Sequence, residues 1–294
     1  MSYLEKTLKY KKKYLTLKNN QKGGTLTKLD EPDGSFQFPV PDKRITYSTF
    51  SVNGNLYDKD FTLNLNLVKI KLDDEPNKPV LFVIAGFSQE SFMSASYVIL
   101  SKLKLLQIKF SAIFILDYSS MKDLQNFVCG QRNKDLGHFD PDPEKKLNKE
   151  IAKNIHEMLM SSDLSEFQKE NIHLLGKSNG GWIVTLLLKI HPQMFKGLYL
   201  AVPGIPNAHE SLSRIDPSIL QGINFVFGFS QQDAYKFSFG HTSNQEKERY
   251  DEMMRELSLT KYRSYIEDNG LPPDPKIHHE LYQSMIDNII LSLQ

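Results

Sequence analysis

The sequence predicts an α/β fold, with a mostly parallel sheet at its centre and helices on both faces. Short, continuous apolar runs alternate with helical stretches along the chain, and such runs are typical of parallel strands that are buried on both faces. One of these runs is followed at once by a Gly-rich turn and an apolar helix. At 294 residues, the chain accommodates one large domain of this kind plus short appendages.

Composition narrows the class of protein further. Hydrophobic residues make up 40% of the chain and charged residues 24%, which is the balance of a soluble globular protein. No apolar run approaches the roughly 20 residues that cross a bilayer, and the N-terminus lacks the pattern of a secretory signal. We therefore expect neither a transmembrane segment nor export by that route. Cys129 is the only cysteine, which excludes an internal disulfide and a cysteine-rich zinc site.

Residues 1–24 form a basic arm. They carry seven of the 36 Lys and Arg residues but one of the 35 Asp and Glu residues, so the rest of the chain is slightly acidic. One stripe of the arm recurs at intervals of four and three residues, which indicates an amphipathic helix; its members are Tyr3, Thr7, Tyr10, Tyr14 and Leu17. A solvated terminal helix is one interpretation, and contact with a membrane surface, a polyanion or a partner helix is the other. The acidic body gives no reason to expect that it binds nucleic acid.

The arm resembles an N-terminal segment of giant DNA virus (mimivirus-like) proteins. Residues 2–18 read SYLEKTLKYKKKYLTLK and are followed by Gly23 and Gly24, similar to the pattern YLEKYLKYKKKYLxLK followed by Gly-Gly in those proteins. The resemblance implies a viral protein located in the virion or the host-cell cytoplasm, whose arm contacts a virion component. It also implies that the Gly-Gly pair serves as a processing site or a packaging signal.

Residues 25–44 are rich in Gly, Pro, Asp and Lys, which predicts a linker and places the folded domain at residues 45–294. Within that domain, apolar periodicity predicts the remaining secondary structure. Buried strands are expected at 80–85, 111–117, 172–175, 197–202, 223–229 and 261–267, and helices at 92–106, 147–160, 182–190, 245–257 and 280–293.

Two further strands are expected at the start of the domain. Residues 45–52 and 61–72 predict an antiparallel pair that is joined across a loop containing Asn53 and Gly54. In the second strand, the alternation of apolar residues changes phase after Leu67. This change predicts a β-bulge.

The Gly-rich turn carries the most specific motif of the chain. It reads GKSNGG over residues 176–181, between a predicted strand and a predicted helix, and it matches G-x-S-x-G in its proper context. Such a turn holds its serine, Ser178, in a strained backbone conformation, while Gly176 and Gly180 remove side chains that would collide. The alternative is an ordinary turn whose serine caps the helix. The glycine spacing does not match a phosphate-binding loop.

With this motif in place, the chain from residue 45 onward resembles the α/β-hydrolase superfamily. Compact carboxylesterases and lysophospholipase-like thioesterases are the most similar members, because residues 203–222 leave room for a short lid at most and little or no cap domain. The resemblance implies a serine hydrolase that cleaves a carboxylic ester or thioester through an acyl-enzyme, without a metal or an organic cofactor. Lipases, peptidases and acyltransferases use the same catalytic groups, so these activities stay open.

A serine nucleophile needs a histidine to accept its proton and a carboxylate to orient that histidine. The superfamily order of serine, acid and histidine implies Asp233, which follows a buried strand, as the acid. Asp274 is the alternative acid. His279 is the expected base, because the apolar residues of the closing helix follow it at the spacing seen in small esterases, and His278 is the second candidate. The adjacent histidines do not have the spacing of a zinc-binding helix.

A tetrahedral intermediate also needs backbone N–H groups that stabilise its oxyanion. The N–H of Asn179, directly after the nucleophile, is one candidate donor. The resemblance implies a second donor in the loop after the strand at 80–85, where Phe87 is the candidate, although the histidine usual in that loop is absent.

Other residues near these motifs have simpler interpretations. Lys177 is expected to be solvated, with recognition of an anionic substrate as the alternative, and Trp182, Met158 and Met160 are expected in the core. The long connection 118–146, which contains Cys129 and His138, is a candidate rim of the site.

A different class of function also fits this sequence. The fold can be retained as a non-catalytic scaffold that serves as a virion or host-interaction protein, with the arm as its working part.

Overall fold

The computed structural model describes ten segments of the chain, and the predicted basic arm lies outside them. The described residues are 25–29, 44–56, 59–75, 77–86, 89–118, 143–160, 170–203, 207–231, 242–267 and 283–294. Their strands are β1 (Thr25–Leu29), β2 (Ile45–Leu56), β3 (Lys59–Lys71), β4 (Val80–Ile84), β5 (Ala112–Asp117), β6 (Ile172–Ser178), β7 (Phe195–Pro203), β8 (Asn224–Ser230) and β9 (Tyr262–Glu267).

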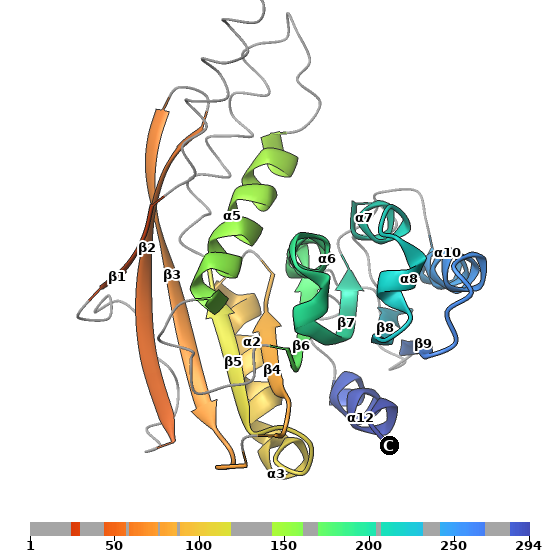
Figure 1. The fold of residues 1–294 in the computed structure, drawn as a ribbon. Helices are drawn as coiled ribbons and strands as arrows, with labels where there is room; N and C mark the ends of the chain where they lie inside the picture. Colours follow the sequence, from red (N-terminus) through yellow and green to blue (C-terminus); the bar gives the residue numbers. More distant parts are fainter. Residues whose placement is uncertain are drawn as a thin grey trace, which may run out of the picture.

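These strands form one sheet in the order β1-β2-β3-β5-β4-β6-β7-β8-β9 (Figure 1). The pairs β1/β2, β2/β3 and β3/β5 are antiparallel. From β5 to β9 every neighbouring pair is parallel. The carboxyl ends of these six strands therefore share one edge of the sheet, which is where open α/β sheets bind their ligands.

Helices cover both faces of the sheet, as the sequence predicts. One face carries α2 (Gln89–Ser101), α3 (Leu103–Leu106) and α12 (Gln283–Ser292), whose buried side chains join one apolar cluster. The opposite face carries α5 (Pro143–Met160), α6 (Asn179–Ile190), α7 (Asn207–Ser213), α8 (Pro217–Leu220) and α10 (Ser243–Glu256), which join a second cluster. A short 3-10 turn, η3 (Pro192–Met194), follows α6. The central strands β4 and β5 are buried along their whole length.

The first hairpin differs from its prediction. Asn53 and Gly54 lie inside β2, paired with Thr62 and Phe61 of β3, and the two strands extend to Leu56 and Lys59. The Asn53 carboxamide oxygen accepts a hydrogen bond of 2.6 Å from the Thr62 hydroxyl. This cross-strand bond gives the asparagine a partner within the ladder, so the Asn-Gly pair does not form the turn.

The predicted bulge after Leu67 is also wrong, because the β2/β3 register runs without a shift. Leu63, Leu65 and Leu67 pack into the cluster beneath α5, whereas Val68 and Ile70 pack into the cluster on the opposite face. The strand thus passes from contact on one face to contact on the other. The change of phase in the sequence therefore reflects which face of the strand packs against a helix layer, and not a bulge.

The N-terminal boundary of the sheet lies earlier than expected. Residues 25–29, predicted as part of the linker, form β1 and pair with residues 49–53 of β2. Composition alone missed this strand, because an edge strand is stabilised by a ladder with a distant partner rather than by its own apolar periodicity.

The helix predicted at 92–106 is divided in two at Lys102, whose φ of −109° and ψ of 10° interrupt it. The Lys102 Nζ lies 2.9 Å from a carboxylate oxygen of Asp287 in α12. This partly buried ion pair joins α3 to α12. The last turn is therefore oriented by a tertiary contact that is absent from the local sequence pattern.

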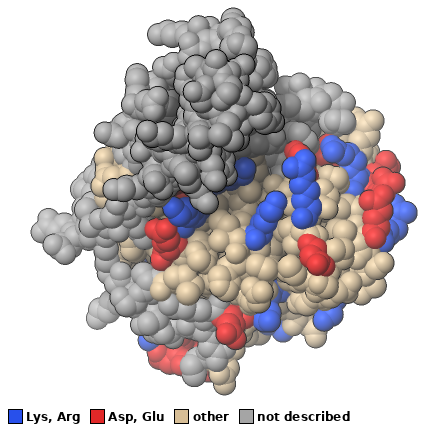
Figure 2. Space-filling view, turned by 45° about the horizontal axis from the view of Figure 1, so that its top comes forward, with Lys and Arg blue, Asp and Glu red and all other residues tan. Residues whose placement is uncertain are grey.

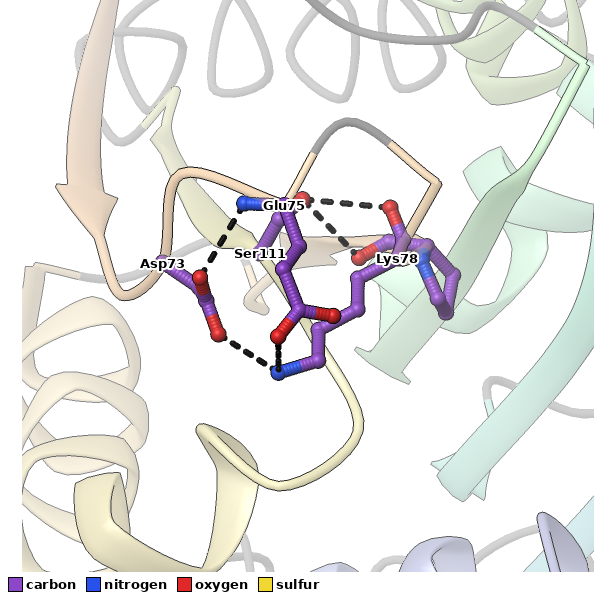
Figure 3. A network of polar contacts seen from close by, with 5 residues as sticks. Asp73, Glu75, Lys78 and Ser111 are labelled. Atoms are coloured by element: carbon purple, nitrogen blue, oxygen red, sulfur yellow. Dashed lines mark hydrogen bonds and ion pairs between the residues drawn. The ribbon is translucent and has the colours of Figure 1, made fainter.

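A network of polar side chains lies at the edge of the sheet where β4 and β5 begin (Figure 3). The Lys78 Nζ lies 2.5 Å from a carboxylate oxygen of Asp73 and 3.4 Å from one of Glu75. The Ser111 hydroxyl donates to the Lys78 carbonyl oxygen at 3.1 Å. The hydrogen bond from Lys78 lowers the pKa of Asp73. The network thus joins the connection before β4 to the start of β5 and lies at the amino ends of the strands.

The described surface carries charge of both signs. Figure 2 shows basic and acidic side chains interspersed among uncharged residues on one face. No helix within the described ranges is both long and apolar enough to span a bilayer.

Candidate active site

The predicted nucleophile turn is formed at the carboxyl edge of the sheet. Ser178 is the last residue of β6, and α6 begins at the next residue. Its φ of 52° and ψ of −123° lie in a region that residues with a side chain rarely adopt. Although Ser178 precedes the first helical residue, its side chain makes no capping hydrogen bond. The alternative of an ordinary helix-capping serine is therefore not supported, and the hydroxyl is not used by the helix.

Both outer glycines of the motif are required by close contacts. A Cβ added to Gly180 would lie 2.2 Å from the Ile84 carbonyl oxygen and 2.3 Å from the Ala85 carbonyl oxygen. A Cβ added to Gly176 would lie 2.6 Å from the Gly180 carbonyl oxygen. The start of α6 therefore touches the end of β4, and the turn itself is folded tightly enough to exclude a side chain.

Gly86, which follows the end of β4 by two residues, lies beside the nucleophile. A Cβ added to Gly86 would lie 3.4 Å from the Cβ of Ser178. The Gly86 N–H donates to the Ser91 hydroxyl oxygen at 2.9 Å, so this N–H is already engaged. Phe87, the predicted second oxyanion donor, is the next residue and lies outside the described residues.

A buried set of polar side chains, which sequence reasoning missed, surrounds Asn179. The Asn148 amide donates to the Asn179 carboxamide oxygen at 2.9 Å, and the Asn179 amide donates back at 3.2 Å. The Asn179 amide also lies 3.4 Å from the hydroxyl of Tyr118, which donates to the Ala85 carbonyl oxygen at 2.8 Å. Asn148 stands on the helix face that also presents Ile151, so a polar residue on that apolar stripe was the available signal.

The predicted acid and bases lie in segments that the structure does not describe, namely Asp233, the alternative Asp274, and His278 and His279. Elements around these segments are described. The chain leaves β8 at Ser230 and β9 at Glu267, which are paired in register. Because β6 to β9 are parallel, both exits lie at the same edge of the sheet as Ser178.

The segment that contains the two candidate bases is joined to the fold at both ends. Glu267, at the end of β9, accepts a hydrogen bond of 2.7 Å from the Ser284 hydroxyl in the first turn of α12. Burial raises the pKa of Glu267. The Gln231 N–H donates to the Glu267 carbonyl oxygen at 2.9 Å, which joins the ends of β8 and β9.

The four histidines that the structure describes make their contacts with groups other than the nucleophile. His173, near the start of β6, is buried and contacts Tyr199 at 2.6 Å, and burial lowers its pKa to about 4. The rings of His156 and His191 stack with their centroids 5.4 Å apart, next to the C-terminal end of α6. His209 contacts the Arg249 carbonyl oxygen of α10. None of the contacts of these four histidines involves Ser178.

For the residues near the nucleophile turn, some predictions of burial are confirmed and others are wrong. Lys177, expected to be solvated, is buried with 2% of its surface exposed, because the strand is covered on both faces up to the turn. Trp182 and Met158 are in the core as predicted, whereas Met160 is 45% exposed at the end of α5. Cys129 and His138 lie outside the described residues. No group of three or more His, Cys, Asp or Glu side chains within the described segments could hold a metal ion.

Comparison with known proteins identifies the fold. No protein-family model matches the chain, and no curated protein matches its sequence significantly. Among solved structures, a hyperthermophilic esterase from Pyrobaculum calidifontis is 11% identical with a TM-score of 0.51, covering 86% of this chain and 83% of that one. A CE1 ferulic acid esterase from Anaeromyces mucronatus is 13% identical with a TM-score of 0.50, covering 90% and 97%.

A third similar structure is a predicted CIB-like hydrolase from Thermoplasma acidophilum. It is 12% identical, with a TM-score of 0.50 and coverage of 84% of this chain and 99% of that one. The mostly parallel sheet with helices on both faces agrees with the fold of these structures. The chain therefore has the α/β-hydrolase fold.

Proposed function

We propose that the protein is a serine hydrolase that cleaves a carboxylic ester or thioester through an acyl-enzyme. The observation that carries the proposal is the backbone of Ser178, which has a positive φ and a side chain that does not cap α6. Strain of this kind costs about 1–3 kcal/mol and persists at functional sites. The names of the similar structures, an esterase and a ferulic acid esterase, support ester chemistry by analogy of fold.

In the proposed reaction, the Ser178 hydroxyl attacks the substrate carbonyl carbon while His279 takes its proton and Asp233 orients the imidazole. The N–H groups of Asn179 and Phe87 stabilise the oxyanion of the tetrahedral intermediate. The protonated histidine then gives its proton to the leaving alcohol or thiol. Water attacks the acyl-enzyme by the same route and releases the acid. If His278 is the base, it makes the same proton transfers in place of His279.

Labelling with a fluorophosphonate probe tests this proposal without knowledge of the substrate. We expect the wild type to be labelled, and Ser178→Ala and His279→Ala to lose labelling. Ser258→Ala is a matched control, because Ser258 also has a positive φ, 54°, but lies in the turn after α10. His278→Ala separates the two candidate bases.

A folded wild type that is not labelled contradicts the proposal and favours the non-catalytic scaffold. Loss of labelling in Ser258→Ala as well would show that labelling reports only on general stability.

We also propose that the protein is located in the virion or the host-cell cytoplasm. This proposal rests on the resemblance of residues 2–24 to the N-terminal segment of giant DNA virus proteins. Mass spectrometry of purified particles and of infected cytoplasm tests it, and absence of the chain from both would contradict it. Peptides that begin at Thr25 would support processing after Gly24, and an intact N-terminus would contradict processing.

A further inference from the structure

The peptide between Ala85 and Gly86 is held from both sides. Its carbonyl oxygen accepts a hydrogen bond of 2.8 Å from the Tyr118 hydroxyl, and its N–H donates to the Ser91 hydroxyl oxygen at 2.9 Å. Ala85 and Tyr118 are each 1% exposed. Since the plane of a peptide has no internal freedom, two bonds on opposite sides fix its orientation. The next peptide along the chain carries the N–H of Phe87.

Asn179 is held in a comparable way from the opposite side of the site. Its side chain exchanges two hydrogen bonds with Asn148, of 2.9 and 3.2 Å. Asn148 is fully buried in α5. The Asn179 amide also reaches the Tyr118 hydroxyl at 3.4 Å, so one chain of contacts runs from Asn148 through Asn179 and Tyr118 to Ala85.

This chain of contacts spans the two segments that supply the candidate oxyanion donors. One candidate donor, Phe87, follows Gly86 directly in the sequence, and the other is Asn179, the first residue of α6, more than 90 residues later. Their backbones touch where Gly180 meets the carbonyl groups of Ile84 and Ala85. A hole built from two separate segments works only if their N–H groups keep a fixed separation and direction.

We propose that Tyr118 and Asn148 are positioning residues that hold the two sides of the oxyanion hole in register. This inference rests on the proposed hydrolase function and adds a requirement to it. The Tyr118 hydroxyl donates a hydrogen bond to the Ala85 carbonyl oxygen, and Asn148 orients Asn179 from the buried face of α5. Neither side chain is required to touch the substrate.

The protonation of Tyr118 agrees with this role. Burial raises the pKa of Tyr118 above its usual range. The hydroxyl therefore keeps its proton at every pH at which a histidine base works, and the hydrogen bond to Ala85 is not lost by titration. The positioning contact is thus independent of the protonation steps of catalysis.

Removing the Tyr118 hydroxyl tests the inference directly. In Tyr118→Phe, we expect the rate constant for fluorophosphonate labelling to fall at least about 10-fold, because a misplacement of about 1 Å in a catalytic site costs up to about 100-fold in rate and complete loss of one oxyanion donor costs about 100-fold or more. With p-nitrophenyl acetate, kcat should fall by a similar factor while KM changes less than about twofold, since the oxyanion forms only in the transition state.

Tyr199→Phe is the matched control. Tyr199 is also fully buried and also forms a hydrogen bond, to His173. His173 is the second residue of β6 and Ser178 is the last, so this contact lies at the opposite end of the strand from the nucleophile. We expect Tyr199→Phe to lower the melting temperature without lowering kcat. Equal losses of kcat in both variants would overturn the positioning role and assign the effect to general stability.

The pair of asparagines allows a second test. Asn179→Ala keeps its backbone N–H but loses the contacts with both Asn148 and Tyr118, so it should slow labelling at least as much as Asn148→Ala. The double variant should be no slower than the slower single variant, because both changes break the same contact. Fully additive losses would overturn the role of Asn148, since they would mean that the two side chains act independently.

Failure of this inference is distinguishable from failure of the proposed function. If the wild type is labelled and Tyr118→Phe is labelled at the same rate, the positioning role is wrong and the hydrolase proposal stands. If the folded wild type is not labelled, both are wrong.

Discussion

Replacing Gly180 with alanine should separate α6 from the end of β4. The new Cβ would lie 2.2 and 2.3 Å from two backbone carbonyl oxygens, about 1 Å inside ordinary van der Waals contact. Neither atom belongs to a flexible side chain, so the helix and the strand must move apart. Overpacking of this kind costs typically about 1–3 kcal/mol, and we expect the upper end of that range, about 3 kcal/mol.

Two measurements follow the effect of Gly180→Ala. Thermal unfolding monitored by circular dichroism should show a melting temperature lower by roughly 6–12 °C, since 1 kcal/mol corresponds to about 2–4 °C in a large domain. At a temperature where the variant is folded, fluorophosphonate labelling should be slower by about 100-fold, because a displacement of about 1 Å at a catalytic turn has an effect of that size.

Gly222→Ala is the control for the same chemical change. A Cβ at Gly222 would meet no atom within 4 Å, so its melting temperature and labelling rate should match those of the wild type or show a small gain in stability. A Gly180→Ala variant that melts and reacts like the wild type would refute the argument that this glycine is required by contact with β4.

Two further predictions concern strain and pH. Ser178→Gly and Ser178→Ala should both be unlabelled. In urea titrations, the free energy of unfolding of the glycine variant should be higher by about 1 kcal/mol, because glycine adopts the positive φ of 52° without strain and only part of this gain is lost to the greater freedom of its unfolded chain. Equal stabilities of the two variants would contradict strain at this position. Burial lowers the pKa of His173 from 6.5 to about 4, so between these pH values the unfolded chain binds the extra proton and the free energy of unfolding falls as the pH falls. From pH 7.5 to pH 5, the wild type should therefore lose about 2 kcal/mol more stability than His173→Gln in urea titrations, and equal losses would mean that His173 does not carry this dependence.

Features that depend on neighbours in the sequence were predictable. The strand from residue 172, the turn at Ser178 and the helix that follows are set by apolar runs and by glycines whose need arises within a few residues. The alternation of buried strands and helices likewise gave the parallel part of the sheet, because each element shows its own period. The contacts of Tyr118 and Asn148 were missed, because they depend on which segments the sheet order places side by side.

The wrong predictions also arose because contacts between distant segments are not visible in the local sequence. The hairpin pattern of Asn53 and Gly54 was overridden by a longer ladder between β2 and β3. The exposure assumed for Lys177 ignored the layers that cover β6 on both faces, and the strand β1 exists only because β2 offers an edge for pairing. In each case a long-range contact outweighed a local preference.

By itself, the sequence determined the α/β class and the strained turn around Ser178, whereas the acid and the histidine base stay predictions. Only the tertiary structure decided that Gly180 meets the end of β4, that Gly86 lies beside Ser178, and that Asn148 bonds to Asn179. The physical reason is one of range. Periodicity and turn chemistry act over a few residues, whereas the register of two distant segments is set by the packing of the whole sheet and its helices.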